Sequence, residues 1–173
     1  MSELLFNELP RPTFRWLRVN HTVSSLAGED TAVQSIAVEA NKNILSPLPV
    51  GTALLDGNYE GANKEAVHVL VEKAEGYAIN VPPKAKEVVG IRIDANARVA
   101  NRFQFIVGEG AELEVQFYVT GSGDALTNVS YLNEYDVKEA GKVVVKKVNL
   151  LPEHVQHIEH RYTKLEEKAD VEY

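Results

Sequence analysis

Apolar and polar residues alternate with a period of two along most of the chain after residue 75. The clearest runs are Tyr77–Val81, Val89–Ile93, Phe103–Val107, Leu113–Phe117 and Val143–Val148. Successive side chains of a strand point to opposite faces, so short alternating runs are typical of half-buried strands. Helical periodicity is nearly absent over the same stretch, and the chain is therefore predicted to be mainly β.

The first part of the chain is less regular. A short helix is predicted over residues 2–9, where Pro10 and Pro12 end it. The aromatic and aliphatic cluster around Trp16, the only tryptophan, is interpreted as a lid packed on the core. Strands are predicted over 32–40 and over 50–55, with a loop over 41–49 between them. A further strand is predicted from residue 65, where Val67, Val69 and Val71 alternate with His68 and Leu70. We divide the chain into an N-terminal helical or irregular segment, 1–31, and a β domain, 32–173.

A recurring corner indicates how the strands are arranged. Four segments share an acidic or glycine-containing turn, then a small residue, then alternating apolar positions; their small residues are Ala97, Ala111, Gly141 and Ala169, with steps of 14, 30 and 28 residues. Small residues allow strands to stack closely, and a regular period places successive turns on top of one another. An antiparallel stack would need two-residue turns, and only Asp56-Gly57 offers one. The pattern favours a right-handed parallel β-helix over a sandwich.

Charge and composition restrict the partners. The 173 residues carry a net charge of −7, which disfavours nucleic acid and anionic membrane surfaces as partners. The chain has no cysteine, which removes disulfides, thiolate metal sites and cysteine nucleophiles. No stretch is long and apolar enough to span a bilayer, and the first nine residues lack the basic region of a signal peptide. We expect a cytoplasmic protein.

Three histidines are the most conspicuous candidate for chemistry. His154, His157 and His160 would follow one face of a helix and could there hold a zinc or iron ion. On a strand, His154 and His160 face one way and His157 the other, so the three cannot bind one ion. The flanking alternation favours a strand, and we interpret the set as a solvated polar face.

Other motifs are explained by turns. The glycine pairs of Gly108-Glu109-Gly110 and Gly121-Ser122-Gly123 match no phosphate-binding loop, and Glu166-Glu167 precedes a corner residue. No catalytic, cofactor-binding or metal-ligating residue is assigned. The chain is not expected to be an enzyme in its own right.

Two strings resemble a known family. The N-terminal string Asn7-Glu-Leu-Pro-Arg-Pro-Thr-Phe-Arg-Trp-Leu-Arg-Val-Asn20 is similar to the opening of short SufB/SufD proteins, which support iron–sulfur cluster assembly in the SUF system. Val107–Phe117 resembles the recurring β-helix coil of that family, and Ala125–Val129, a further coil and Glu166–Tyr173 follow in the family's order. The resemblance covers most of the chain.

The resemblance implies a non-catalytic scaffold that pairs with a like subunit and works with a SufC-type ATPase. SufB-type members carry a cysteine before a threonine where this chain has Val119-Thr120, so that thiol is missing. The other cluster-related residues and the segment that docks the ATPase belong to the family's C-terminal half, which this chain does not reach. No cofactor is therefore expected in this segment, although an iron–sulfur cluster is possible for the full-length complex. A homo-oligomer is also expected.

The strand that begins at Ala169 is expected to leave an uncapped coil, as in an expressed fragment or a reduced family member. Such an end should associate through its open edge. The alternative function is a β-helix or cupin-like carbohydrate-active enzyme, with acidic groups in a groove. The scarcity of aromatic residues that could stack on sugars argues against it. A structural adhesin is disfavoured because no secretion signal is present.

Overall fold

Two five-stranded sheets form the body of the protein. The computed structural model describes residues 3–6, 22–25, 36–59, 63–96, 99–121 and 127–173. The first sheet contains, in spatial order, β12 (Asp170–Glu172), β10 (Lys142–Leu150), β8 (Glu112–Thr120), β6 (Lys86–Asp94) and β3 (Ile36–Glu39). The second contains β11 (Val155–Leu165), β9 (Thr127–Val137), β7 (Val99–Val107), β5 (Gly76–Val81) and β4 (Leu45–Leu48).

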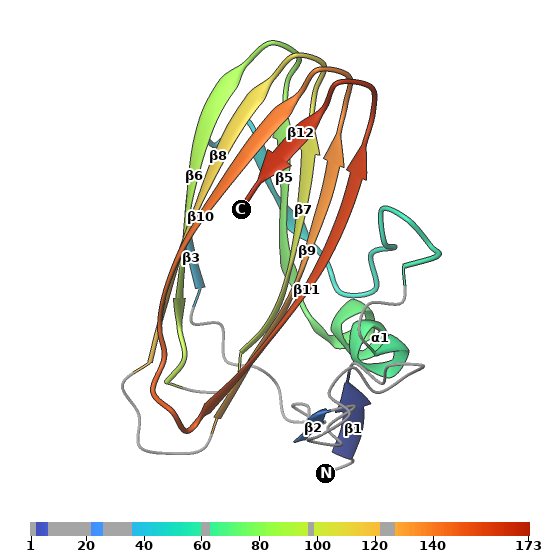
Figure 1. Ribbon diagram of the computed structural model, residues 1–173. Helices are drawn as coiled ribbons and strands as arrows, with labels where there is room; N and C mark the ends of the chain where they lie inside the picture. Colours follow the sequence, from blue (N-terminus) through green and yellow to red (C-terminus); the bar gives the residue numbers. More distant parts are fainter. Residues whose placement is uncertain (1–2, 7–21, 26–35, 60–62, 97–98, 122–126) are drawn as a thin grey trace, which may run out of the picture.

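The chain passes from one sheet to the other at every strand from β5 to β12, so it winds as a solenoid (Figure 1). Each strand pairs in parallel with the strand two places later in sequence, as β6 does with β8 and β7 with β9. Within the two five-stranded sheets, only the described strands β3 and β4 pair antiparallel, each at the edge of its sheet. The predicted parallel β-helix is confirmed, with about three turns.

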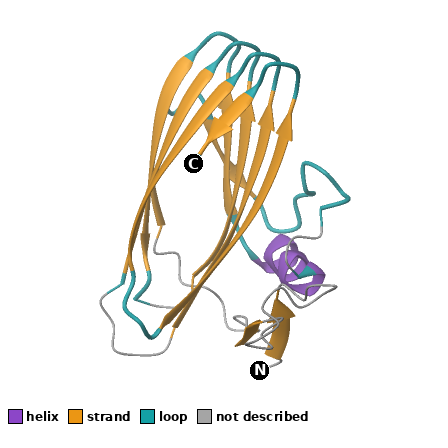
Figure 2. Cartoon of the chain, in the orientation of Figure 1, coloured by secondary structure: helices purple, strands orange, loops and turns teal. Residues whose placement is uncertain are grey.

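The tight turns at one end of the solenoid stack as the repeat predicted (Figure 2). The N–H groups of Ala111, Gly141 and Ala169 each donate to the carbonyl oxygen three residues earlier, at 2.9–3.1 Å. The residue after each corner donates to the corner residue of the preceding coil, at 2.8–3.0 Å. The corner beneath Ala111 is Ala85, and the predicted anchor Ala97 lies outside the described residues.

The residue before each corner adopts a left-handed backbone. The φ angles of Lys84, Gly110, Ala140 and Lys168 lie between +54° and +61°. Glycine meets this requirement without strain, which confirms Gly110 as a turn glycine. The other three coils place lysine or alanine there, and this explains why glycine alone does not mark the repeat.

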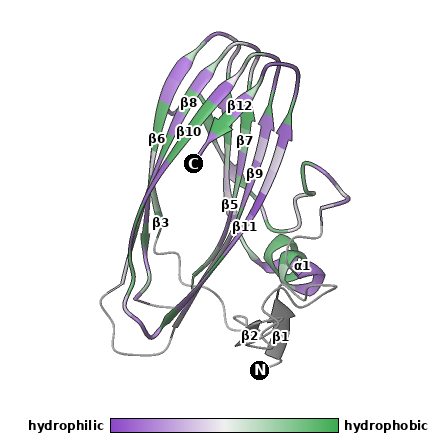
Figure 3. Ribbon diagram, viewed as in Figure 1, coloured by the Kyte–Doolittle hydropathy of each residue, from purple (hydrophilic) through white to green (hydrophobic). Residues whose placement is uncertain are grey.

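The space between the sheets is filled by the inward member of each alternating pair. Rings stack from coil to coil, with 4.7 Å between the ring centroids of Phe105 and Tyr135 and 5.8 Å between those of Phe117 and Tyr131. Figure 3 shows the resulting alternation of hydrophobic and hydrophilic positions along the strands. Burial of these side chains is the main force holding the coils together.

Residues 64–73 form a helix and not the predicted strand. Helix α1 (Lys64–Lys73) begins after Asn63, whose Oδ1 accepts a hydrogen bond from the N–H of Ala66 at 2.9 Å. Its apolar positions also fit a helical period, and Val67 and Leu70 pack on Leu132 of β9. The period-two pattern of Val67, Val69 and Val71 was therefore misleading, and α1 covers the outer face of the second sheet.

Three other expectations fail in the first part of the chain. Residues Glu3–Phe6 form β1, which pairs antiparallel with β2 (Thr22–Ser25) in place of the predicted helix over 2–9. Residues 50–55 are loop, whereas β4 lies inside the predicted loop 41–49. Pro47 is tolerated in β4 because an edge strand leaves some N–H groups outside the ladder. No described helix is long and apolar enough to cross a membrane.

Candidate functional site

The interior of the last coil carries several polar and charged side chains, whereas the coils before it are filled mainly by apolar side chains, with the inward Asn101 and Asn133 as exceptions. Register places Lys147 beside Phe117, His157 beside Val129 and Glu159 beside Tyr131. Neighbouring residues in parallel strands share a face, so these polar side chains point between the sheets. We call the following set the charged layer: Lys147, Asn149, His157, Glu159, Arg161 and Thr163.

Glu159 is the centre of the charged layer. Its carboxylate accepts hydrogen bonds from Lys147 Nζ, from Arg161 Nε and Nη2 at 2.9 and 3.0 Å, and from Asn133 Nδ2 at 2.8 Å. Burial raises the pKa of Glu159, but the hydrogen bonds and charges of Arg161 and Lys147 outweigh burial and lower it. Burial also lowers the pKa of Lys147, against the pull of Glu159. The carboxylate is therefore held ionised at neutral pH.

Aromatic rings border the two cations. Lys147 Nζ lies 5.0 Å from the ring centroid of Tyr131, and Arg161 Cζ lies 4.5 Å from that of Tyr173. The hydroxyl of Tyr173 is 2.9 Å from Thr163 Oγ1, which places the end of the chain across the layer. Burial raises the pKa of Tyr131, whose buried hydroxyl has no hydrogen-bond partner among the described residues.

The three predicted histidines do not meet. His157 and His160 lie on β11 and point to opposite faces, and His154 precedes the strand, so the strand prediction is confirmed. The predicted solvated face is wrong, because His160 is only 2% exposed and His157 points between the sheets. In the described part of the chain, no three His, Cys, Asp or Glu side chains group to hold a metal ion.

Burial of His160 predicts a loss of stability in acid. Burial lowers its pKa from 6.5 to about 4, and burial lowers that of His157 to about 4 with help from the charge of Lys147. A histidine whose pKa is lower in the folded than in the unfolded protein contributes stability at pH values above its unfolded pKa. This stability is lost as the pH falls from the unfolded pKa through the folded pKa. For His160 the expected loss is about 3 kcal/mol between pH 6.5 and 4.

Urea denaturation at several pH values measures this effect. His160→Gln should reduce the fall in unfolding free energy between pH 6.5 and 4. The fall that remains should come from His157. An equally steep decline in His160→Gln would contradict the assignment to His160.

A second polar cluster lies on the outer face of the second sheet, and we call it the clasp: Arg102, Gln104 and Glu134. Arg102 and Glu134 are fully buried, with 3.0 Å between Nη2 and Oε2. Gln104 Nε2 donates to the same oxygen at 3.1 Å. Register places Gln104 of β7 beside Glu134 of β9, so the solenoid itself brings the groups together.

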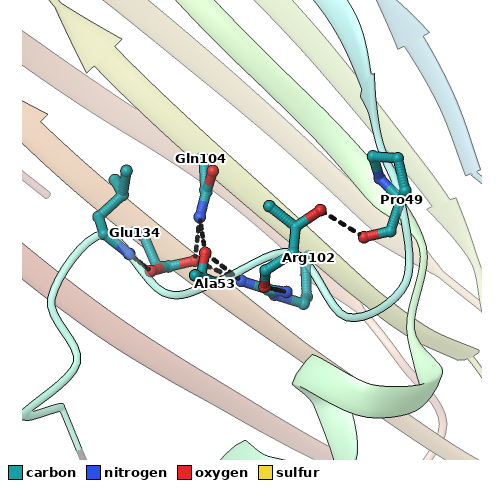
Figure 4. Close-up of polar contacts among 7 residues, drawn as sticks. Pro49, Ala53, Arg102, Gln104 and Glu134 are labelled. Carbon is teal, nitrogen blue, oxygen red and sulfur yellow. Dashed lines mark hydrogen bonds and ion pairs between the residues drawn. The ribbon is translucent and has the colours of Figure 1, made fainter.

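The clasp holds residues 49–59, which we call the strap, against the sheet (Figure 4). Arg102 Nη1 donates to the carbonyl oxygen of Thr52 at 2.6 Å, and Gln104 Nε2 donates to that of Ala53 at 3.0 Å. Glu134 Oε1 accepts from the N–H of Leu55 at 2.7 Å. The backbone beside the clasp is also closely packed: a Cβ at Gly76 of β5 would lie 1.8 Å from the carbonyl oxygen of Arg102.

The strap also reaches the last strand of the sheet. The hydroxyl of Tyr162 donates to Asp56 Oδ2 at 2.6 Å, and the rings of Tyr59 and Tyr162 are 5.1 Å apart. This hydrogen bond lowers the pKa of Asp56 and raises that of Tyr162 to about 12. The clasp and Tyr162 thus both attach the strap to the outer face of the second sheet, which is a structural role.

No protein family, curated protein or solved structure matches this chain. The interpretation therefore rests on the fold and on the side chains of the two polar clusters. Val119 is fully buried in the core. Sequence reasoning did not identify the clasp or the charged layer, because outward polar residues and inward charged residues both resemble ordinary solvated strand positions.

Proposed function

We propose that the protein is a non-catalytic scaffold of SUF-type iron–sulfur cluster assembly that acts in the cytoplasm. The parallel solenoid with stacked corners is the observation that carries this proposal. It is the architecture that the N-terminal string and the coil segments led us to expect. The partners are a SufB/SufD-like subunit and, for the full-length protein, a SufC-type ATPase.

The state of the buried carboxylates supports a scaffold more than a carbohydrate-active enzyme. A glycosidase needs one carboxylic acid with a raised pKa and one free carboxylate. In the charged layer, Glu159 is bound by two cations and its pKa is lowered. In the clasp, Glu134 is occupied by Arg102, Gln104 and the strap. Both groups hold structure together.

Deleting the gene tests the proposal. Iron–sulfur enzymes such as aconitase should lose activity under iron limitation, and the intact gene should restore it. Affinity capture adds a second readout, in which the protein should retain a SufB/SufD-like subunit. Unchanged iron–sulfur enzyme activity, with a growth defect on a polysaccharide, would replace the scaffold with the carbohydrate-active alternative.

A further inference from the structure

Two hollows lie one after the other on the outer face of the first sheet, where β6, β8 and β10 run side by side (Figure 1). The first hollow has a volume of about 350 Å³, and the residues that line it include Glu39, Gly90, Arg92, Gln116, Tyr118 and Val148. The second, of about 330 Å³, lies nearer the stacked corners, and its lining includes Lys86, Val88, Glu112 and Val144. We call the two hollows together the groove.

Gly90, at the centre of β6, is explained neither by its backbone conformation nor by packing. Its φ angle does not lie in the left-handed region. A Cβ at Gly90 would lie 3.6 Å from the Cβ of Glu39, which is an ordinary contact, whereas a Cβ at Gly76 or Gly108 would meet backbone atoms at 1.8 or 2.6 Å. Glycine inside a strand weakens the strand and often marks the close approach of a ligand. Here the glycine leaves the floor of the first hollow open, where a larger side chain would fill it.

The first hollow combines an aromatic ring with two exposed charges. Tyr118 is 41% exposed, and Arg92 Cζ lies 5.8 Å from the centroid of its ring. Arg92 and Glu39 are both exposed, and neither forms an ion pair within the described residues. Hydroxyl groups can accept hydrogen bonds from a guanidinium and donate them to a carboxylate, while the C–H face of a sugar ring can pack on an aromatic ring. The side chains of the first hollow therefore fit a sugar.

The other charges beside the first hollow are already paired. Glu114 accepts hydrogen bonds from Gln116 Nε2 at 2.6 Å and from Lys146 Nζ at 2.8 Å. The two charges that remain, those of Arg92 and Glu39, cancel. The first hollow therefore favours an uncharged ligand over a polyanion, as does the net charge of the chain, −7.

The groove lies on the face of the sheet and not at its edge. Strand β8 pairs with β6 on one side and with β10 on the other, so its backbone groups are already used by the two ladders. An extended peptide gains affinity by adding a strand to a free edge, which this face does not offer. A ligand here must be recognised by side chains. Two hollows in line along the strands suit a chain of repeating sugars, because a chain that occupies both binds more tightly than a single unit.

We propose that the groove binds a linear polysaccharide of uncharged sugars. One sugar ring packs on Tyr118 with its hydroxyls between Arg92 and Glu39, and the chain continues over Val88 in the second hollow. The site binds and does not cleave, since glycosidases need two carboxyl groups and Glu39 is the only one among the described residues that line the first hollow. This inference goes beyond the proposed function and does not depend on it.

Affinity electrophoresis of the purified protein tests the ligand class. Native gels that contain amylose, mannan, xylan or a mixed-linkage glucan are compared with a gel that contains the acidic polymer polygalacturonate. At least one of the uncharged polymers should slow the protein, and the effect should persist at high salt because no charge is shared with the ligand. No retardation by any uncharged polymer, or retardation by polygalacturonate alone that salt abolishes, would overturn the proposal.

Two variants test the place of binding. Tyr118→Ala removes the stacking ring and should weaken binding by about ten-fold or more, as the loss of a central aromatic contact does. Gly90→Gln keeps every other side chain and fills the first hollow, so it should also weaken binding; the space around a Cβ at Gly90 allows the substitution without a clash. Val50→Ala is the matched control, because Val50 is 46% exposed and lies on the strap, outside the groove.

Circular dichroism melts of the variants show that weaker binding is not loss of folding. Retardation that is unchanged in Tyr118→Ala and in Gly90→Gln would overturn the assignment to the groove. Failure of polysaccharide binding and failure of the cluster-assembly role are separate outcomes. The first appears in the mobility of the purified protein, and the second in the iron–sulfur enzyme activity of the deletion strain.

Discussion

Glu134→Gln is expected to lower the free energy of unfolding by about 3–5 kcal/mol. The substitution keeps the size of the side chain and an oxygen that can accept from the N–H of Leu55. It removes the only described carboxylate that pairs with the fully buried Arg102. An unpaired guanidinium in a buried site costs far more than the ion pair contributes, since its desolvation is no longer offset.

Chemical denaturation of Glu134→Gln beside Glu166→Gln measures this difference. Glu166 pairs with Lys138 at 3.1 Å, but 44% of its side chain is exposed, so solvent screens the pair and its loss should cost little stability. The combined variant Arg102→Met with Glu134→Leu removes both charges and should recover part of the loss. If Glu134→Gln is no more destabilising than Glu166→Gln, the clasp does not depend on its charge pair.

The solenoid could be predicted because its repeat is written in local features. Ala111, Gly141 and Ala169 each follow a turn and precede alternating residues, and the structure stacks these corners. Ala85 was missed because Pro82-Pro83 replaces the acidic or glycine turn of the other coils. The same geometry is reached there by a different sequence, with Lys84 in the left-handed conformation.

Short elements with mixed signals could not be predicted in this way. Helix α1 contains three valines, which favour strands, and its identity depends on the Asn63 cap and on packing against Leu132. Tertiary contacts of this kind override local propensity. The alternating valines of α1 give the same pattern as a strand, and only the packing of this segment on the sheet distinguishes a helix from a strand.

The clasp and the charged layer depend on which residues the coils bring together. Arg102 and Glu134 are 32 residues apart, and their pairing requires the register of β7 and β9. Glu159 alternates with neighbours as a solvated residue would, yet it points between the sheets. The sequence could show that these positions are polar, but not that a strap or a final coil would bury them.

Phe103→Ala is expected to cost about 3–5 kcal/mol of unfolding free energy, as for other fully buried aromatic residues. Phe103 is 0% exposed. Its ring centroid lies 6.5 Å from that of Tyr77 in one neighbouring coil and 6.4 Å from that of Tyr131 in the other. It also meets Phe117 edge to face across the core, at 5.8 Å.

Urea titration followed by circular dichroism measures the loss, with Phe103→Leu and Tyr118→Ala as controls. Phe103→Leu keeps most of the volume and should cost less, and Tyr118→Ala removes a ring that is 41% exposed on the outer face. Because Phe103 contacts both neighbouring coils, its loss should weaken the coupling between coils as well as stability. We therefore expect a broader transition for Phe103→Ala. A loss no larger than that of Tyr118→Ala would show that the coils are held by their backbone ladders, with little contribution from the rings between the sheets.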